Sequence, residues 1–579
     1  MESQGRNAPW RGGLWLAIAV AAIMFVYPLL LASRIPLLDP DEGLHAAIAQ
    51  EMVQRGDWIC PSLQGKAFLD KPILYFWAEA ASLKLFGDCE AAVRLPGLMF
   101  GLLGMIATAV AARRMFGRTA GLVAAVFYGT MVLPVALAQA AAHDVALIPW
   151  ITTAILLFWE SERARSCRAA IAYAAAIGLL LGLSILTKGL VGVALVGITY
   201  GSYLVLGRRL TTAACLRGLV ALLVAALVGS TWYVAMEFRS PGYLRYYFIE
   251  RHLMGFATDT QLHGHQPWWF YLPLLLGGSL PWIAYLPVLI QDQWAKRNER
   301  AKDSGHWQSQ WHTAENHGPG SPLLLVACWL VGCTFFLSLS HSKMVTYVWP
   351  VFPAAAILAA VAWTRLLDGT LGPAARQLLA RTFWSSCLAG PLLLPVALLV
   401  VQRQFGVRLA GATWALAVAV SLLSWMPLGF WLMKGPRGAL TAGVLVTVGQ
   451  FVFLMTVVLP QVAGGLSARD LAAYFNRSGQ LPARLLVAEE RLGSLVFYLD
   501  GSLRAGLQDQ QLQAITFHDM LNPRLAGSVA VVALAERQAT RAAEHDVDLT
   551  GLPYEQAGHY RLYRPAVLMA VRISPAQWK

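Results

Sequence analysis

The chain has 579 residues, of which 57% are hydrophobic and only 13% charged, and its mean hydropathy is +0.53. Soluble domains carry about twice that charge, so the composition excludes an array of soluble domains and indicates a polytopic membrane protein. The formal net charge of +13 falls in short basic clusters between apolar segments, which is typical of cytoplasmic loops and not of a surface that binds nucleic acid.

Apolar segments long enough to cross a bilayer recur as far as residue 460. Basic residues cluster in alternate connections, starting with Arg6 and Arg11 before the first segment, so the N-terminus is expected in the cytoplasm. An odd number of spans then places the C-terminal region on the opposite side. The expected spans are thirteen: 14–32, 95–111, 119–140, 144–159, 169–187, 190–206, 218–236, 268–290, 322–339, 347–364, 383–401, 410–432 and 439–460.

The longest polar interruption in the first part of the chain is the loop 33–94, and its first stretch predicts a helix. Asp39 is the expected N-cap, with Pro40 at the first helical position and Gly56 closing the helix. Apolar residues recur between them at helical spacing, which is typical of an amphipathic helix lying on a membrane surface. This interpretation accounts for Asp39 and Glu42 as residues that favour a helix start.

Capping leaves Asp41 and the pair Asp70–Lys71 unexplained. Two interpretations of Asp41 stay open: an acid favoured by the helix dipole, or a carboxylate that faces a reaction site. Asp70 and Lys71 stand directly before the apolar stretch PILYFW. The seven cysteines show no ligand spacing and are expected as small buried side chains, with a disulfide between Cys60 and Cys89 as the lesser alternative.

Further polar residues lie at the ends of segments on the same side as this loop. Asp144 begins one segment and is either a partner of the helix dipole or a functional acid at the membrane edge. Lys188 separates two other segments and either extends to the interface or meets an anion. Lys343 and Tyr347 are one helical turn apart and either anchor the segment at the interface or hold a phosphate together. His252 matches no tight zinc motif.

After Pro460 the charge returns to soluble levels, and short apolar strand-like runs such as RLLVAEE and SVAVVALAE alternate with helix-like stretches. We expect a small α/β domain over 465–579 on the outer side, beyond a membrane domain over 1–464. The sequence holds no Walker loop, no GxGxxG after a strand, no HExxH and no GxSxG. Carboxylates, lysines and tyrosines on one side of a membrane bundle suit a reaction on a lipid phosphate ester.

Several stretches match a known family in the same order along the chain: DPDEGLHAAIAQEMVQRGDW, FLDKPILYFW, AVRLPG, the HD at 143–144, LTKG, the RH at 251–252, HQPWWFYLP and SKMVTYVWPVFP. They resemble the bacterial branch of the protein O-mannosyltransferase superfamily, and especially the aminoarabinose transferases that modify lipid A. The resemblance implies a C-type glycosyltransferase fold: an α-helical polytopic membrane protein of about thirteen transmembrane helices with a small C-terminal α/β periplasmic domain. The stretch GSLVFYLDG resembles the outer domain of these transferases more weakly.

The resemblance implies a role for each matching acid. Asp41 would be the principal catalytic carboxylate and Asp144 the second acid, and we keep the neighbouring Glu42 with them as a catalytic candidate. Asp70 would bind a divalent metal, zinc or else magnesium or manganese, with His252 as the second ligand. Asp70 departs from the glutamate that the family usually has, and this shortens the reach to a metal.

The lipid phosphate would be contacted by Lys71, Lys188 and Tyr347 according to the same resemblance, and Lys343 is the further candidate for this site. The chain departs from the family in this clamp as well, because the transferases tend to carry an arginine shortly after an EH pair, where this chain has RHLMGF.

The predicted function is an inverting glycosyltransferase of the bacterial inner membrane, with its active site facing the periplasm. It would move a sugar, with 4-amino-4-deoxy-L-arabinose as a candidate, from undecaprenyl phosphate to lipid A or another envelope acceptor. Two alternatives stay open: an enzyme like the protein O-mannosyltransferases, and a non-catalytic carrier of polyprenyl phosphate or sugar. A carrier is favoured by internal repeats with paired broken helices, and the sequence shows none.

Overall fold

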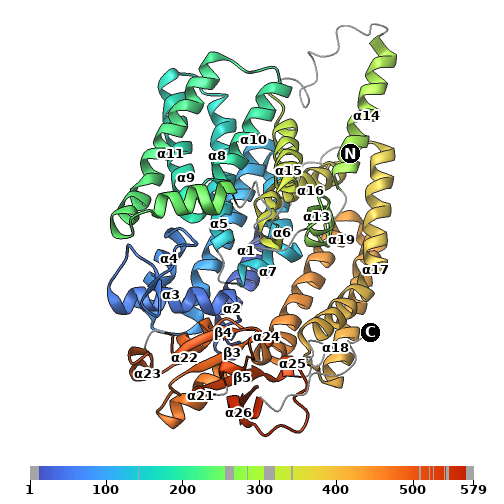
Figure 1. Ribbon diagram of the computed structural model, residues 1–579. Helices are drawn as coiled ribbons and strands as arrows, with labels where there is room; N and C mark the ends of the chain where they lie inside the picture. Colours follow the sequence, from blue (N-terminus) through green and yellow to red (C-terminus); the bar gives the residue numbers. More distant parts are fainter. Residues whose placement is uncertain are drawn as a thin grey trace, which may run out of the picture.

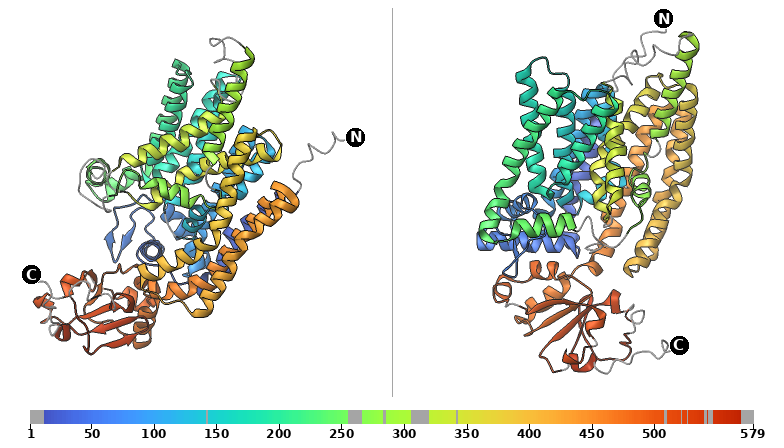
Figure 2. Two further views of the ribbon diagram at one scale, coloured as in Figure 1. Left: turned by 90° about the vertical axis from the view of Figure 1, so that its right-hand side faces the viewer. Right: turned by 45° about the horizontal axis from the view of Figure 1, so that its top comes forward.

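The chain folds into a bundle of long helices with an α/β region at one end, as Figure 1 shows for the computed structural model. The structure describes residues 12–568 apart from 141–142, 255–265, 283–284, 305–319, 341–342, 508–509, 521, 526, 540–541 and 543–546. Two further views show the same arrangement (Figure 2), with the α/β region below the bundle and the loop of residues 33–94 between them.

The N-terminal elements are α1 (Gly13–Ala21), η1 (Ala22–Val26), α2 (Tyr27–Leu31) and η2 (Ala32–Arg34), followed in the first loop by α3 (Asp41–Arg55), β1 (Ser62–Leu63), β2 (Lys66–Ala67) and α4 (Leu74–Phe86). The next elements are α5 (Glu90–Phe116), α6 (Arg118–Tyr128), α7 (Val132–Ala138), η3 (His143–Ala146), α8 (Leu147–Ser161), α9 (Cys167–Lys188), α10 (Val191–Leu206), α11 (Thr212–Arg239) and η4 (Arg245–Met254). The bundle is completed by α13 (Tyr271–Gly278), α14 (Tyr285–Ser304), α15 (Pro322–Leu339), η5 (Val345–Val351), α16 (Phe352–Leu367), α17 (Pro373–Phe405), α18 (Gly411–Leu422), η6 (Leu423–Trp425), α19 (Met426–Phe453), η7 (Leu454–Val458), α20 (Leu459–Ala463) and η8 (Gly464–Leu466).

Within the described residues, nine helices are long and apolar enough to cross a membrane, or ten if α6 and α7, which meet at a 62° bend, form one span. The expected count of thirteen is not confirmed. Part of the difference lies in kinked segments, because the predicted spans 410–432 and 439–460 fall in one helical stretch, Gly411–Leu466, that breaks at Gly435 with φ 68°. The predicted span 190–206 is the shorter helix Val191–Leu206.

The α/β region holds a five-stranded sheet with the strand order β4-β3-β5-β7-β6. Strands β3, β4 and β5 are parallel, and β7 and β6 continue the sheet antiparallel. All four residues of β3 are buried, as expected for a parallel strand covered on both faces. Its elements are α21 (Arg469–Ser478), β3 (Leu485–Ala488), α22 (Gly493–Tyr498), α23 (Gly501–Ala505), β4 (Leu512–Ile515), α24 (Phe517–Met520), η9 (Pro523–Leu525), β5 (Val531–Ala535), α25 (Glu536–Ala539), β6 (Glu555–Ala557), β7 (Tyr560–Tyr563) and α26 (Pro565–Leu568). The division of the chain into domains 1–464 and 465–579 stays a prediction.

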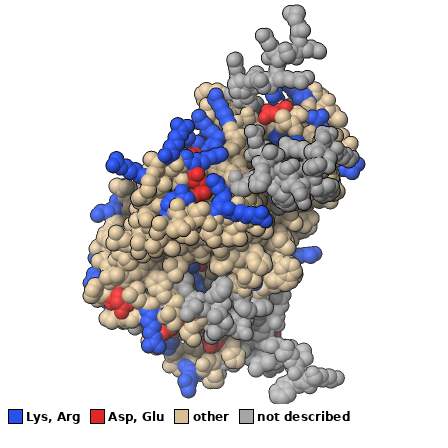
Figure 3. Space-filling model, turned by 90° about the horizontal axis from the view of Figure 1, so that it is seen from above, with Lys and Arg blue, Asp and Glu red and all other residues tan. Residues whose placement is uncertain are grey.

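The two ends of the bundle differ in charge. Glu162 forms ion pairs with Arg209, at 3.7 Å, and with Arg217, so the α8–α9 and α10–α11 connections meet at one end. At the other end of the α8–α9 hairpin, Asp144 and Lys188 form an ion pair. Figure 3 looks at the end opposite the α/β region and shows Lys and Arg side chains gathered there.

The helix α3 is enclosed, not laid on a membrane surface, so the amphipathic surface helix expected from the sequence is wrong. Nine consecutive positions and Met52 are buried: Glu42, Gly43, Leu44, His45, Ala46, Ala47, Ile48, Ala49, Gln50 and Met52. The reason is that α3 packs on α4 at one side and on α22 of the α/β region at the other. Gly56 closes the helix with φ 67°, as predicted.

Glycines allow α3 and α22 to pack backbone against backbone. A Cβ on Gly493 would overlap the backbone of Gly43 and Leu44, and one on Gly43 would overlap the backbone of Ser494. Each helix therefore needs a residue without a side chain at the point of closest approach.

Candidate active site

The centre of the candidate site is the ion pair between Asp144 and Lys188. Asp144 lies in η3 at the start of α8, where the helix dipole favours an anion, and Lys188 is the last residue of α9, where it favours a cation. The ammonium of Lys188 also lies 4.2 Å from the centre of the Tyr347 ring, which is a cation–π contact. The side chains of Lys188 and Asp144 are only 14% and 10% exposed, so both charges are largely shielded from water.

Two charged residues of the first loop face this pair. Lys71 interacts electrostatically with both Asp144 and Lys188, and Asp41 interacts with Lys188. Lys71 is half-buried and donates no hydrogen bond within the described part of the chain. Lys188 is balanced by Asp144, so Lys71 supplies a positive charge with open hydrogen-bonding positions, which is the property needed to bind an anion.

Asp41 is the first residue of α3, and 59% of its side chain is exposed. Its nearest cation is the guanidinium of Arg491 in the α/β region, at 4.0 Å. At this distance the carboxylate keeps both oxygens available to a ligand, since no hydrogen bond to it is formed by the described residues. The structure thus gives Asp41 the access to solvent and substrate that a general base requires.

Glu42 is placed quite differently from its neighbour. It is buried, forms a bidentate pair with Arg94 at 2.7 and 2.9 Å, and accepts a hydrogen bond from the backbone N–H of Leu38 at 2.8 Å. Arg94 also donates to the carbonyl groups of Ile35 and Pro36. Because these donors occupy both carboxylate oxygens, the geometry assigns Glu42 to holding the loop, and its catalytic role has no support from the structure.

The predicted N-cap at Asp39 is wrong. Helix α3 has no side-chain cap, and the Asp39 carboxylate instead accepts hydrogen bonds from the backbone N–H of Ser494, at 3.0 Å, and from the Ser494 hydroxyl. Burial raises the pKa of Asp39 to about 7, although the hydrogen bonds from Ser494 oppose this shift. The residue that looks like a local cap therefore ties the first loop to the α/β region.

Asp70, one of the two predicted metal ligands, accepts a hydrogen bond from the hydroxyl of Tyr246 at 2.8 Å. Tyr246 belongs to η4, which also contains residue 252, but the side chain of His252 lies outside the described residues. Among the residues that are described, no three His, Cys, Asp or Glu side chains lie close enough to hold a metal ion. The divalent metal stays a prediction.

Lys343 donates to the backbone carbonyl of Gln266 at 3.0 Å and to that of Ser340. It is 6% exposed, and burial lowers the pKa of its ammonium. Its hydrogen bonds hold two connecting segments together, and its predicted contact with a phosphate stays untested. Cys60 and Cys89 are both free thiols, so the disulfide alternative is not found.

Two features of the site were not singled out from the sequence. Arg94, in AVRLPG, is a charged residue inside a long apolar helix, and such residues usually pair with a buried partner, so a signal for it existed. The second feature is an aromatic cluster under Asp144, in which the ring of His143 lies 4.6 Å from His45, 4.8 Å from Tyr75 and 4.6 Å from Phe76. Only the packing of α3, α4 and η3 brings these rings together.

Residues 70–234, which include Lys71, Asp144 and Lys188, match the family described as dolichyl-phosphate-mannose-protein mannosyltransferase. The chain is 31% identical over 363 residues to an undecaprenyl phosphate-alpha-4-amino-4-deoxy-L-arabinose arabinosyl transferase of Edwardsiella ictaluri, and the alignment covers 62% of this chain and 61% of that protein. It is 28% identical over 575 residues to a transferase with the same name from Pseudomonas fluorescens, with 94% of this chain and 93% of that protein covered. The chain is thus similar to the aminoarabinose transferases.

The crystal structure of ArnT from Cupriavidus metallidurans bound to undecaprenyl phosphate has the same fold, with a TM-score of 0.70, 21% identity, and 96% of this chain and 98% of that chain covered. The predicted resemblance to the aminoarabinose transferases is therefore confirmed, together with the helical membrane fold that it implied. The chain is a multi-pass membrane protein with an ArnT-like fold.

Proposed function

We propose that this chain is an inverting glycosyltransferase that moves a sugar from an undecaprenyl-phosphate donor to an acceptor at the outer face of the bacterial inner membrane. The observation that carries the proposal is the arrangement of Asp41, Lys71, Asp144 and Lys188 at one end of the bundle. This is the end opposite the arginine clusters, and basic connections are typical of the cytoplasmic side. The periplasmic position of the site rests on this argument.

The cations act on the leaving group. When the bond between the anomeric carbon and the phosphate oxygen breaks, negative charge develops on the polyprenyl phosphate. Lys71 supplies the positive charge for this step, and the ammonium of Lys188, which is balanced by Asp144 and lies against the face of the Tyr347 ring, adds N–H groups that can donate to the phosphate oxygens. Because the pair is shielded from water, its interaction with a phosphate is stronger than at an exposed surface.

Asp41 acts on the acceptor. Its carboxylate takes the proton of the acceptor hydroxyl while the hydroxyl oxygen forms the new bond to the anomeric carbon. Attack from the face opposite the departing phosphate inverts the configuration at that carbon. Asp41 is the carboxylate suited to this step, since Glu42 is buried against Arg94 and Asp144 is paired with Lys188.

The names of the relatives support 4-amino-4-deoxy-L-arabinose as the sugar and undecaprenyl phosphate as the carrier. We propose lipid A as the acceptor, with another envelope glycolipid as the alternative. The family matched by residues 70–234 favours protein O-mannosyl transfer as the second candidate. A carrier without chemistry would bind the polyprenyl phosphate and have no use for the exposed carboxylate of Asp41.

The decisive experiment compares the envelopes of cells with and without the gene by mass spectrometry. The proposed function predicts lipid A species that carry an added aminoarabinose only when the gene is present. Loss of a hexose from envelope proteins would favour the O-mannosyl alternative. Unchanged lipids and proteins, together with altered export of the carrier lipid, would favour the non-catalytic carrier.

A further inference from the structure

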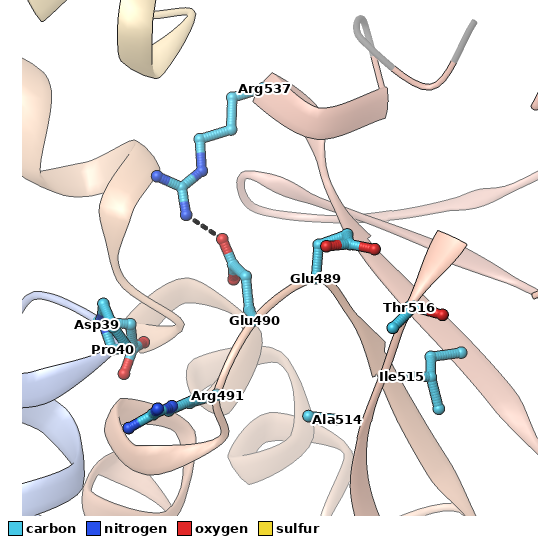
Figure 4. A pocket seen from close by; sticks show the side chains of 9 residues that line it. All are labelled: Asp39, Pro40, Glu489, Glu490, Arg491, Ala514, Ile515, Thr516 and Arg537. Carbon is cyan, nitrogen blue, oxygen red and sulfur yellow. Dashed lines mark hydrogen bonds and ion pairs between the residues drawn. The ribbon is translucent and has the colours of Figure 1, made fainter. Parts of the chain in front are cut away.

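Two cavities in the described part of the chain have different linings. The larger, of about 350 Å3, lies where the α/β region faces the first loop, and Figure 4 shows charged side chains of both signs around it, such as Glu490 and Arg537. The smaller, of about 120 Å3, lies among α8, α9, α10 and α11 and is lined mostly by apolar side chains. An apolar cavity within a membrane bundle suits hydrocarbon, so the smaller cavity indicates a definite class of ligand.

The smaller cavity lies in the gap between two consecutive helices. Only five residues join α10 to α11, but α11 packs along α9, whereas α10 packs on α15, α9 and α8. Figure 1 shows α10 and α11 standing apart. Ile177 and Leu181 of α9 are buried and form the floor of the gap. Gly197 of α10 and Leu222 of α11 line the cavity and are exposed, so it opens toward the surface of the bundle, where the bilayer lies.

The cavity is apolar along its length and polar at one end. Its lining residues on α9 run from Ala174 to Leu181, which is about 10 Å along the helix axis. The polar lining residues meet at one end, where Arg217 donates to the carbonyl group of Ser161 at 3.3 Å and the hydroxyl of Tyr200 lies near the Arg217 guanidinium. Ser161 is the last residue of α8, so this is the end with the arginine-rich connections.

That end of the cavity carries a surplus of positive charge. Glu162 pairs with both Arg217 and Arg209, so two guanidinium groups share one carboxylate. The carboxylate is only 6% exposed, whereas Arg209 and Arg217 are 33% and 20% exposed and can be reached from outside. Six arginines and two glutamates lie in residues 160–168 and 207–217 together, and Figure 3 shows basic side chains gathered at this end. Basic connections alone are typical of a cytoplasmic end, but here an apolar cavity begins at them.

We propose that this cavity binds an acyl chain of an anionic phospholipid, with the lipid phosphate at the cluster of Arg209, Glu162 and Arg217. Arginine binds phosphate through charge-assisted hydrogen bonds, and basic pockets between transmembrane helices on the cytoplasmic side bind anionic headgroups. The orientation given by the basic connections places this lipid in the cytoplasmic leaflet. The cavity lies toward the opposite end of α9 from Lys188, so this site is separate from the candidate active site and the inference does not depend on the proposed function.

The first test compares two lipids with the same acyl chains on the full-length protein in detergent. Native mass spectrometry should show at least fivefold more retained phosphatidylglycerol than phosphatidylcholine. A Cβ on Gly197 meets no atom within 4 Å, so the leucine of Gly197→Leu has room to fill the cavity. This variant should retain at least fivefold less phosphatidylglycerol and keep the melting temperature of the lipid-free wild type. Gly449→Leu is the matched control, since Gly449 is an exposed glycine of α19 with the same open space and lies outside the cavity.

The second test separates the role of the headgroup. Arg217→Gln should lower the preference for phosphatidylglycerol over phosphatidylcholine at least threefold, because the cluster loses its surplus charge. Arg437→Gln should leave the preference unchanged, since Arg437 is an exposed arginine of another basic connection. An equal effect of both substitutions would mean that the basic end attracts anionic lipids without a specific site, and would overturn the inference.

Photolabelling of the wild type decides the question without any variant. Phosphatidylglycerol with a photoreactive group in an acyl chain should label the cavity segments 193–200 and 217–222 more strongly than the other lipid-facing helices. Even labelling of all these helices, equal retention of the two lipids by the wild type, or undiminished phosphatidylglycerol in a folded Gly197→Leu would each overturn the inference. So would loss of the label on adding undecaprenyl phosphate, which would assign the cavity to the chain of the carrier lipid. None of these measurements uses the transfer reaction, so failure of the proposed function would leave their outcome unaffected.

Discussion

At the scale of single residues, neighbouring acids in the stretch Asp39–Glu42 have three different tasks. Asp39 bonds to Ser494, Asp41 is exposed at the start of α3, and Glu42 is buried against Arg94. The sequence could show that three acids precede a helix, but not which of them meets a partner in another region. The partner decides the role, and that partner is set by tertiary packing.

The role of Asp41 is tested by replacing it with asparagine. Asp41→Asn keeps the size of the side chain and removes the base, so the transfer rate should fall by about 10²–10⁴. The protein should keep its thermal stability, because the Asp41 side chain makes no hydrogen bond to a described residue. Asp500→Asn is a matched control, since Asp500 is an exposed acid directly before helix α23 and should be replaceable without loss of transfer. A fully active Asp41→Asn would show that another group takes the proton.

The phosphate contacts are tested by measuring the donor KM. Lys71→Ala removes a charge-assisted donor, which typically contributes about 1.5–3 kcal/mol, so the donor should bind roughly 10- to 150-fold more weakly. Lys84→Ala, an exposed lysine of the same loop, should leave the donor KM unchanged. Tyr347→Phe separates the two uses of Tyr347, because phenylalanine keeps the ring that Lys188 contacts and loses only the hydroxyl. A raised donor KM in Tyr347→Phe would show that the hydroxyl contacts the phosphate. A normal donor KM would show that Tyr347 acts through its ring alone.

At the scale of helices and strands, the glycines of α3 and α22 determine how closely the first loop packs on the α/β region. Gly493→Ala would insert a methyl group against the backbone of Leu44, and overpacking of this kind typically costs about 1–3 kcal/mol. The melting temperature should fall, and Asp41 should shift relative to the bundle, so transfer should slow as well. Gly501→Ala, which meets no atom within 4 Å, should leave both unchanged. An unaltered melting temperature in Gly493→Ala would mean that the two helices are not in backbone contact.

Much of the arrangement of the helices could be predicted from the sequence. The length of the apolar segments indicated the positions of the helices. Asp144 and Lys188 could be placed at the same end of the bundle, because the short connection between α8 and α9 makes these helices antiparallel. The number of spans could not be predicted, because apolar length does not reveal the break at Gly435 or the bend between α6 and α7. The contact of Asp39 with Ser494 joins residues 455 positions apart and leaves no local pattern.

At the scale of the whole molecule, the bundle, the first loop and the α/β region are locked together by polar contacts around the loop. The backbone N–H of Leu37 donates to the hydroxyl of Tyr498, and that hydroxyl donates to Glu90, both at 2.9 Å. The side chain of Gln50 donates to Asp88 and to the carbonyl of Phe497. These contacts tie the first loop, on which Asp41 lies, to the α/β region.

The orientation of the molecule in the membrane gives a direct prediction. The arginine clusters lie at one end of the bundle and the Asp144–Lys188 pair at the other, so the α/β region should face the periplasm. A reporter that is active only outside the cytoplasm, fused after Lys579, should be active. A fusion in the 162–166 connection should be inactive. An active cytoplasmic reporter at the C-terminus would contradict the orientation and the argument that places the site in the periplasm.

The burial of Asp39 between the first loop and the α/β region should make the stability of the protein depend on pH. Burial raises the pKa of Asp39 from 3.8 to about 7, so between these values the folded protein binds a proton that the unfolded chain has released. This residue therefore contributes a loss of stability as the pH rises from about 4 to about 7, and the loss is complete above pH 7. At about 1.4 kcal/mol for each pKa unit, the contribution is at most about 4 kcal/mol. Asp39→Asn cannot ionise, so its melting temperature should exceed that of the wild type at pH 8 and approach it at pH 5. Thermal melts of both proteins across this range measure the difference, and a difference that stays constant with pH would show that Asp39 is already ionised in the folded protein.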